Sequence, residues 1–233
     1  RLASKGSVGW YQAWEAGEWW SPDPLPLFAL FMQHAQHLGD TARAKGPFRH
    51  ALTLAHLFNR TTPQGAQKNI SAHYDLGNDF FKMWLDESMT YSSALFDDLN
   101  FTLYDAQMRK YDAILDRLSS KGEMLEIGCG WGGFATFIAK NFGSKIDAIT
   151  NSKEQFEYTS NKIRNEGLNE KVNVQLKDYR DINEKYDYVS SIEMFEAVGK
   201  KYWERYFEVV KNSLMNGGNA ALQIITILSL IHI

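Results

Sequence analysis

The chain has 233 residues, of which 44% are apolar, 23% charged and 14% aromatic, and its formal net charge is −3. This composition excludes a disordered tail, a collagen-like or low-complexity polymer and a strongly basic nucleic-acid-binding protein, so no nucleic-acid partner is expected. The single cysteine, Cys129, cannot form an intramolecular disulfide, which favours a reducing, cytoplasmic location.

The first 68 residues differ in charge from the remainder and are predicted to form a small, mainly helical N-terminal region. They carry seven Lys and Arg against four Asp and Glu, whereas residues 69–233 carry 18 against 24. An aromatic, glycine-rich stretch over 9–20 is bracketed by turns, and residues 27–38 and 48–59 have the apolar patterning of helices. Basic residues near these helices favour peripheral contact with an anionic membrane surface at its inner face, or shielding of a lipid tail. An equally favoured alternative to this lipid-facing role is a small helical subdomain that packs on the rest of the chain.

From residue 102 onward, helices and strands alternate. We predict helices over 102–119, 134–142, 153–166 and 201–214, and strands over 124–127, 145–149, 172–176, 186–192 and 219–227. Strands separated by helices indicate an α/β fold with a doubly wound, mostly parallel sheet. Ligands of such sheets bind outside the carboxyl ends of the strands. The histidines are not spaced as metal ligands, so no metal site is expected.

The first predicted strand runs into a glycine-rich turn, residues 128–133 (GCGWGG), and then into a helix. Glycines permit a tight turn and let a nucleotide-bearing ligand approach the backbone. The spacing also satisfies the dinucleotide pattern G-x-G-x-x-G. However, the second strand ends in Ile149-Thr150-Asn151 without the acidic residue of a nicotinamide site. Glu126, two positions before the first glycine, instead fits the E-x-G-x-G-x-G motif of class I S-adenosylmethionine (SAM) methyltransferases.

A longer set of motifs lies around this turn. Residues 73–96 read HYDLGNDFFKMWLDESMTYSSALF, which contains H-Y-D-x-x-x-D-F-F, L-D and Y-S-x-A in order. With residues 126–133, Asp178-Tyr179-Arg180-Asp181 and Met194-Phe195-Glu196, this resembles the cyclopropane-fatty-acyl-phospholipid synthase and mycolic acid cyclopropane synthase family. The resemblance covers residues 69–227 and implies a Rossmann-like, class I SAM-dependent methyltransferase domain over 69–233.

The resemblance implies a SAM-dependent C-methyltransferase that acts on the double bond of unsaturated acyl chains of phospholipids. It assigns Tyr91 and Ser92 to the methionine end of SAM, and Glu126, Gly128, Gly130 and Gly132 to the turn beneath it. It assigns Thr150 and Gln155 to the ribose, and Asp178 and Tyr179 to the adenine. Alternatives are a methyltransferase for a different small-molecule acceptor and a non-catalytic SAM-binding or lipid-binding relative.

The resemblance further implies that a bound bicarbonate removes the proton before ring closure. The catalytic candidates that follow from it are Tyr74, Ser93, Glu196, Gln223 and Ile225. Members that hold bicarbonate typically have Cys and His where this chain has Ser93 and Gln223, and a His after the glutamate where this chain has Ala197. Ser and Gln still donate hydrogen bonds to an anion, so one expectation is a bicarbonate site of altered geometry. The other is a methyl-branched or methylene product.

The number of predicted strands bears on the extent of the domain. Five strands are predicted, whereas the fold of the resembled family has seven, with a substrate-covering lid near the last two. We therefore expect the sequence to be a fragment that holds the cofactor half of the domain. An exposed edge on the fifth strand also predicts self-association, with a homodimer as the expected partner.

Overall fold

The computed structural model describes residues 2–34, 77–118 and 122–226. The chain divides into two compact units, Arg1–Arg60 and Thr61–Ile233, and each is described by itself. The helix predicted over 48–59 and the candidate Tyr74 lie outside the described residues.

The described part of the N-terminal unit holds two helices, α1 (Leu2–Glu15) and α2 (Leu25–Gln33). The prediction of a turn at the start of the aromatic stretch is wrong, because residues 9–15 are helical. Glycine disfavours a helix interior, but packing of the tryptophans outweighs this preference. Trp10 stacks on Trp19 with ring centroids 4.7 Å apart, and the Trp19 indole N–H donates to the Trp10 carbonyl over 3.2 Å.

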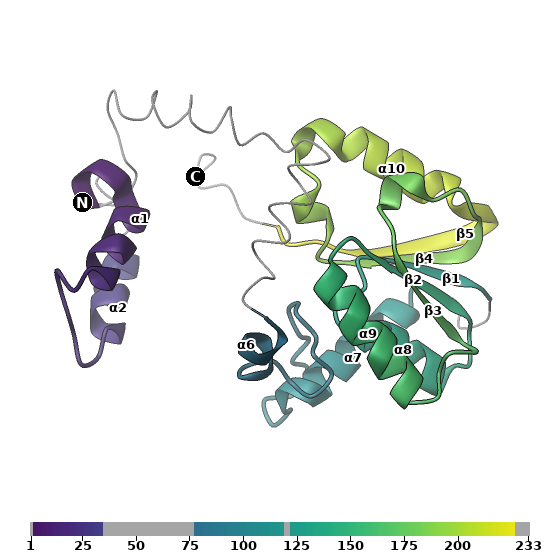
Figure 1. Ribbon diagram of the computed structural model, residues 1–233, viewed down its shortest axis with the longest axis horizontal. Coiled ribbons are helices and arrows are strands. Elements are labelled where there is room, and N and C mark those ends of the chain that lie inside the picture. Colours follow the sequence, from purple (N-terminus) through teal and green to yellow (C-terminus); the bar gives the residue numbers. More distant parts are fainter. Residues whose placement is uncertain (1, 35–76, 119–121, 227–233) are drawn as a thin grey trace. The chain divides into compact units, whose positions relative to one another are not determined.

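The second unit is built around a parallel sheet (Figure 1). Its strands are β1 (Met124–Ile127), β2 (Ile146–Thr150), β3 (Val172–Leu176), β4 (Tyr186–Ile192) and β5 (Leu214–Gln223). Its helices are α6 (Asn78–Lys82), α7 (Leu103–Leu115), α8 (Gly133–Asn141), α9 (Lys153–Asn165) and α10 (Trp203–Asn212), with short 3₁₀ turns at Tyr179–Asp181, Phe195–Ala197 and Lys200–Tyr202. The strand order is β3-β2-β1-β4-β5, and every pairing is parallel. This confirms the predicted doubly wound α/β fold.

Helices cover both faces of the sheet, and the alternation along β1 sorts side chains between them. Met124 packs in a buried cluster with residues of α7, α8 and α9. Leu125 and Ile127 point the other way, into a second cluster with Tyr206 of α10. Glu126 therefore points to the same face as Met124, toward α7 and α8. All four residues of β1 are buried, as expected for the central strand of a parallel sheet.

Four predicted boundaries need correction. α7 ends at Leu115 rather than at 119, because the Arg117 and Leu118 amides donate to carbonyls three residues back and close a tighter turn. α10 ends at Asn212 rather than at 214, and β5 spans Leu214–Gln223 instead of 219–227. Tyr186 of β4 pairs with Leu214 of β5, but Tyr188 pairs with Asn219, so the register shifts between these two pairs. Gly217 and Gly218 therefore lie in an irregularity within β5 and not in a turn before it.

Within the described residues, no helix has both the length and the apolar character needed to cross a membrane.

The same change, Leu→Ala, should affect the free energy of unfolding very differently at a buried and at an exposed position. Leu125→Ala removes a side chain that is 0% exposed at the centre of the sheet, so it should lower the free energy of unfolding by roughly 3–5 kcal/mol. Leu99→Ala removes a side chain that is 100% exposed and should change it by less than about 0.5 kcal/mol. Urea unfolding followed by circular dichroism measures both, and equal losses would contradict the assigned core.

Candidate functional site

A cavity opens at the carboxyl ends of the central strands, where the topology of the sheet places a ligand. Its walls come from the glycine turn after β1, the ends of β2 and β4, and the loop before α7. Eight of the predicted cofactor residues line it: Tyr91, Ser92, Glu126, Gly128, Gly130, Thr150, Gln155 and Tyr179. Gly132 and Asp178 do not line it, although both lie in the segments that form its walls.

The glycine turn owes its shape to three left-handed backbone positions. Gly128, Gly130 and Gly132 have φ of +85°, +53° and +74°, values that residues with a Cβ rarely adopt. A Cβ on Gly128 would lie 2.7 Å from the Met194 side chain, and one on Gly132 would lie 2.4 Å from Thr159. At Gly130 it would meet no protein atom within 4 Å. Gly130 therefore presents bare backbone to the open side of the turn, whereas Gly132 provides room for α9.

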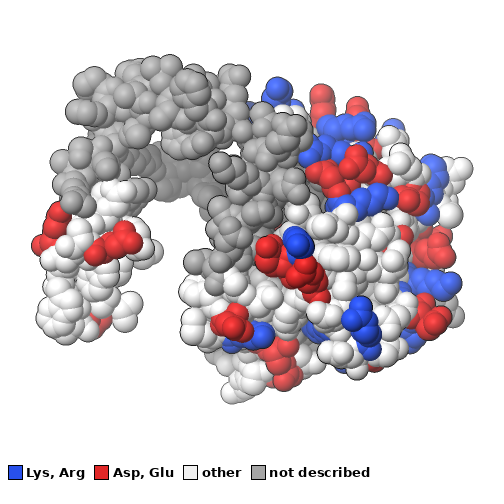
Figure 2. Space-filling view, viewed as in Figure 1, with Lys and Arg blue, Asp and Glu red and all other residues white. Residues whose placement is uncertain are grey.

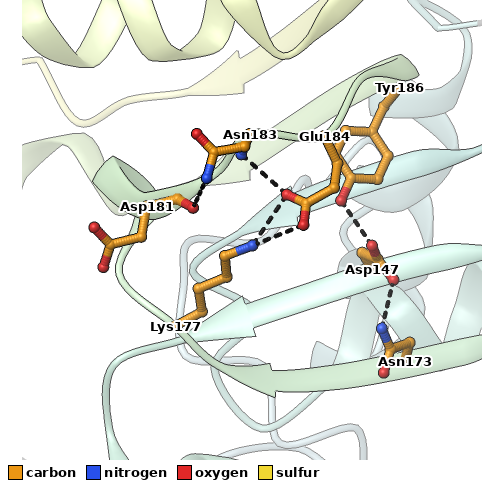
Figure 3. Close-up of polar contacts among 7 residues, drawn as sticks. All are labelled: Asp147, Asn173, Lys177, Asp181, Asn183, Glu184 and Tyr186. Carbon is orange, nitrogen blue, oxygen red and sulfur yellow. Dashed lines mark hydrogen bonds and ion pairs between the residues drawn. The ribbon is translucent and has the colours of Figure 1, made fainter.

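The end of β2 carries neutral groups. The Thr150 hydroxyl donates to Gln155 Oε1 over 2.9 Å, and the Ser152 hydroxyl caps α9 by accepting from the Gln155 amide over 3.3 Å. Asp147, the acidic residue of this strand, is held elsewhere: it accepts from the Tyr186 hydroxyl over 2.6 Å and from the Asn173 amide over 2.9 Å (Figure 3). The carboxylate that would identify a nicotinamide site is thus engaged away from the cavity.

Lys177 comes from the turn after β3 and also lines the cavity. Figure 3 shows its ammonium reaching the Glu184 carboxylate, with nitrogen to oxygen distances of 3.0 and 3.1 Å. Hydrogen bonds from Lys177 and from the Asn183 amide lower the pKa of Glu184 to about 2. Asp178 is likewise engaged, since it accepts from the Arg180 amide and side chain over 2.9 and 2.7 Å.

Glu126 and Lys110 form a buried pair of ionisable groups beside the cavity. Glu126 is 2% exposed, and its Oε2 has no hydrogen-bond partner in the described part of the protein. Burial raises the pKa of Glu126 to about 8, partly opposed by the charge of Lys110 and by the Ala135 amide. Lys110 is 4% exposed, burial lowers its pKa to about 8, and its ammonium donates to the Ser92 hydroxyl over 2.6 Å.

Helix α7 holds the loop that carries Tyr91 and Ser92. Besides the contact from Lys110, the Gln107 amide donates to the Ser92 carbonyl over 2.9 Å, and the Thr90 hydroxyl is hydrogen-bonded to the hydroxyl of Tyr111. Lys110 and Gln107 were not among the predicted site residues. Their spacing of three places them on one face of α7, which also carries Tyr111 and Ile114. A lysine in the same helical row as apolar residues was the signal that could have found them.

Aromatic side chains surround Tyr91. Its ring lies 5.3 Å from Phe81, 5.4 Å from Trp84 and 6.2 Å from Trp131, measured between centroids. Trp131 lines the cavity and is fixed by an indole N–H bond of 2.6 Å to the Asn78 side chain. Burial raises the pKa of the neighbouring Cys129 thiol well above its usual range, so this cysteine is uncharged, as expected for a packing residue.

The structure brings the described catalytic candidates together in two groups. Ser93 and Gln223 meet at the side chain of Glu193, a residue that sequence reasoning did not select. The Ile225 amide donates to Glu196 Oε1. Within the described ranges, no three His, Cys, Asp or Glu side chains come together as a metal site requires.

The model of the mycolic acid cyclopropane synthetase family matches residues 61–231. The chain belongs to this family. It is 37% identical to the cyclopropane-fatty-acyl-phospholipid synthase of Escherichia coli (strain K12), over 94% of the chain and 56% of that protein. It is 35% identical to the tuberculostearic acid methyltransferase of Mycobacterium tuberculosis (strain ATCC 25618 / H37Rv), over 97% of the chain and 55% of that protein.

A solved mycolic acid cyclopropane synthase, complexed with SAH and CTAB, superposes with a TM-score of 0.65 and 30% identity, over 67% of this chain and 55% of that one. The family resemblance read from the motifs is thereby confirmed. The chain spans about half the length of the curated relatives it matches.

The buried carboxyl predicts a specific pH dependence of stability. Between pH 4.5 and about 8, native Glu126 keeps a proton that the unfolded chain has released, so its contribution to stability falls as the pH rises through this window. Glu126→Gln removes this loss. From pH 5 to pH 8, the stability of the variant relative to the wild type should rise by on the order of 3 kcal/mol, since most of the pKa difference lies in this window and one pKa unit corresponds to about 1.4 kcal/mol.

Urea unfolding at both pH values measures this difference. Glu123→Gln, which removes an exposed carboxyl from the same segment, controls for the loss of one acidic group. A constant difference between Glu126→Gln and the wild type across the window would contradict the burial of an ionisable Glu126.

Proposed function

We propose that this domain is a SAM-dependent C-methyltransferase acting on the double bond of unsaturated fatty acyl chains of phospholipids, and that it forms a cyclopropane. The observation that carries the proposal is the bare, left-handed backbone of Gly130 at a cavity on the carboxyl edge of the sheet. Membership of the mycolic acid cyclopropane synthetase family supports the lipid substrate.

The cavity offers groups that suit each part of SAM. The buried Glu126 Oε2, which has no partner among the described residues, is placed to receive the ammonium of the methionine moiety. The neutral Thr150 and Gln155 suit ribose hydroxyls, and the half-buried Tyr179 offers a ring face to the adenine. SAM supplies a methyl group made electrophilic by the sulfonium, and the carbon–carbon double bond supplies the electron pair that bonds to it.

The aromatic cluster at the cavity suits both the acyl chain and the cation that methyl transfer leaves on it. Phe81 and Trp131 are 1% and 2% exposed, whereas Trp84 and Tyr91 are 47% and 41% exposed. Tyr91 and Trp131 line the cavity, and Phe81 and Trp84 pack against them from behind. An apolar wall of this kind admits a hydrocarbon chain and excludes water. Aromatic faces stabilise a carbocation without bonding to it. The CTAB of the solved family member, a surfactant with a long alkyl chain, is consistent with such a substrate.

Access to a phospholipid requires contact with a membrane surface. Figure 2 shows Lys and Arg interspersed with Asp and Glu over the displayed face of the larger unit. In the N-terminal unit, large apolar side chains are exposed instead, with Trp20 at 77% and Met32 at 79%. We propose that peripheral membrane contact is made through the N-terminal unit and depends on apolar insertion more than on a basic patch.

The cofactor assignment predicts the effect of one glycine substitution. Gly130→Val places a branched side chain at the open face of the turn, so binding of SAM and of SAH should be lost, by at least about 100-fold in affinity. Gly167→Val is the matched control, since Gly167 has φ of +68°, has no atom within 4 Å of its Cβ position and does not line the cavity. Isothermal titration calorimetry measures both, with NAD as the ligand expected not to bind the wild type. Equal affinities in the two variants would place the cofactor elsewhere.

The substrate assignment predicts transfer of label from methyl-labelled SAM to lipid. Vesicles of dioleoyl phospholipid should be labelled and vesicles of the saturated distearoyl phospholipid should not, because only the former offers a double bond. Mass spectrometry should find one added CH₂ per modified chain, with the fragmentation of a ring. SAH binding without any lipid labelling would instead favour a different acceptor.

A further inference from the structure

The side chain of Glu193 lies at the meeting point of three hydrogen-bond donors. Its Oε1 accepts from the Ser93 amide over 2.9 Å, from the Ser93 hydroxyl over 2.6 Å and from the Gln223 side-chain amide over 2.8 Å. Ser93 belongs to the loop before α7, Gln223 is the last residue of β5, and Glu193 directly follows β4. Three segments distant in sequence therefore build one carboxylate-binding arrangement.

The backbone of Glu193 is held in a conformation that aims the side chain at this position. Its φ is +49°, a left-handed value that costs a residue with a Cβ roughly 1–2 kcal/mol. Its amide donates to the Gln223 carbonyl over 2.9 Å, so the same glutamine binds both the main chain and the side chain. Met89 is the other non-glycine residue with positive φ in the described part, and both residues line the cavity. Among the described residues, the strained non-glycine backbone therefore lies at the candidate site.

The second carboxylate oxygen has a different environment. No donor of the described residues reaches Oε2 of Glu193, and the residue is only half-buried. The donors orient the group through Oε1, while its other oxygen remains available to accept a proton.

The donors that would otherwise hold a free anion are already engaged by carboxylates of the chain. Ser93 and Gln223 are bonded to Glu193, and the Ile225 amide is bonded to Glu196. A second anion here would meet the charge of Glu193 without these donors to offset it. The arrangement therefore favours a resident carboxylate over a bicarbonate from solution.

We propose that Glu193 is the built-in base of the reaction, an inference that rests on the proposed function. The π electrons of the double bond form a bond to the methyl carbon, and the S–CH₃ bond breaks with its electron pair staying on sulfur. The resulting lipid cation loses a proton from the new methyl group to Glu193. The electron pair of that C–H bond closes the three-membered ring onto the cationic carbon, and Glu193 later releases the proton to water.

The first test measures whether Glu193 or bicarbonate occupies the position between the donors Ser93 and Gln223, and it does not require catalytic turnover. Glycine tolerates φ of +49°, so Glu193→Gly should fold while opening the position. ¹³C-labelled bicarbonate, followed by NMR, should show saturable binding to Glu193→Gly and none to the wild type. Saturable binding of equal affinity by both proteins would overturn the assignment.

The second test concerns the base. Glu193→Gln keeps the shape of the side chain but cannot accept the proton, so formation of methylated lipid should fall by at least about 100-fold while SAH affinity stays within twofold. Added bicarbonate or formate should partly restore activity to Glu193→Gly, and removal of bicarbonate should leave the wild type unchanged. Glu204→Gln, at an exposed site on α10, should retain wild-type activity.

The outcomes separate the two proposals. Wild-type activity in Glu193→Gln, or dependence of the wild type on bicarbonate, would refute the base while leaving the methyltransferase assignment intact. A wild type that binds SAH but methylates no acyl chain would refute both the proposed function and the role of Glu193 as base. The NMR titration with bicarbonate would still decide whether Glu193 occupies the position between Ser93 and Gln223.

Discussion

One backbone contact joins the parts of the candidate site. The carbonyl of Ile149, near the end of β2, accepts from the amides of both Gly128 and Cys129, over 3.0 and 2.9 Å. This contact prolongs the pairing of β1 and β2 by one residue and bends the chain toward α8. The bend requires left-handed backbone at three nearby positions, which glycine supplies at little conformational cost. The cavity, the start of α8 and the exposed backbone of Gly130 all depend on this turn.

The sequence predicts those features that local patterns determine. Strands were predicted from the apolar runs of β1, β2 and β4, and a helix from the amphipathic spacing of α9. The structure has these elements in the predicted order. The capping box of Thr102 and Asp105 is present at the start of α7, with the Asp105 amide donating to the Thr102 hydroxyl over 3.2 Å. The family motifs then led to the residues of the turn and of the loop at Tyr91, because each motif is contiguous in sequence.

Features set by distant contacts were not predicted. Helix α1 depends on a stack between Trp10 and Trp19, which a local reading of glycine content cannot anticipate. The role of Lys110 depends on its burial against Ser92, and that of Glu193 on donors 30 and 100 residues away along the chain. Sequence reasoning selected Ser93 and Gln223 as donors to an anion but did not identify the anion, since nothing local to Glu193 indicates its left-handed backbone.

The two acidic residues of the cavity come from neighbouring strands and differ in what surrounds them. Glu126 pairs in register with Ser190 of β4, and Glu193 follows three residues further along that segment. Glu126 is buried with one oxygen unpartnered, so a cation entering the cavity would favour the charged form that burial disfavours. Glu193 is half-buried, and three donors to its Oε1 fix the orientation of the carboxylate before any ligand binds. The same functional group is thus buried with an unpartnered oxygen at one position and oriented by donors at the other, and this difference in solvation and hydrogen bonding underlies the two roles proposed for them.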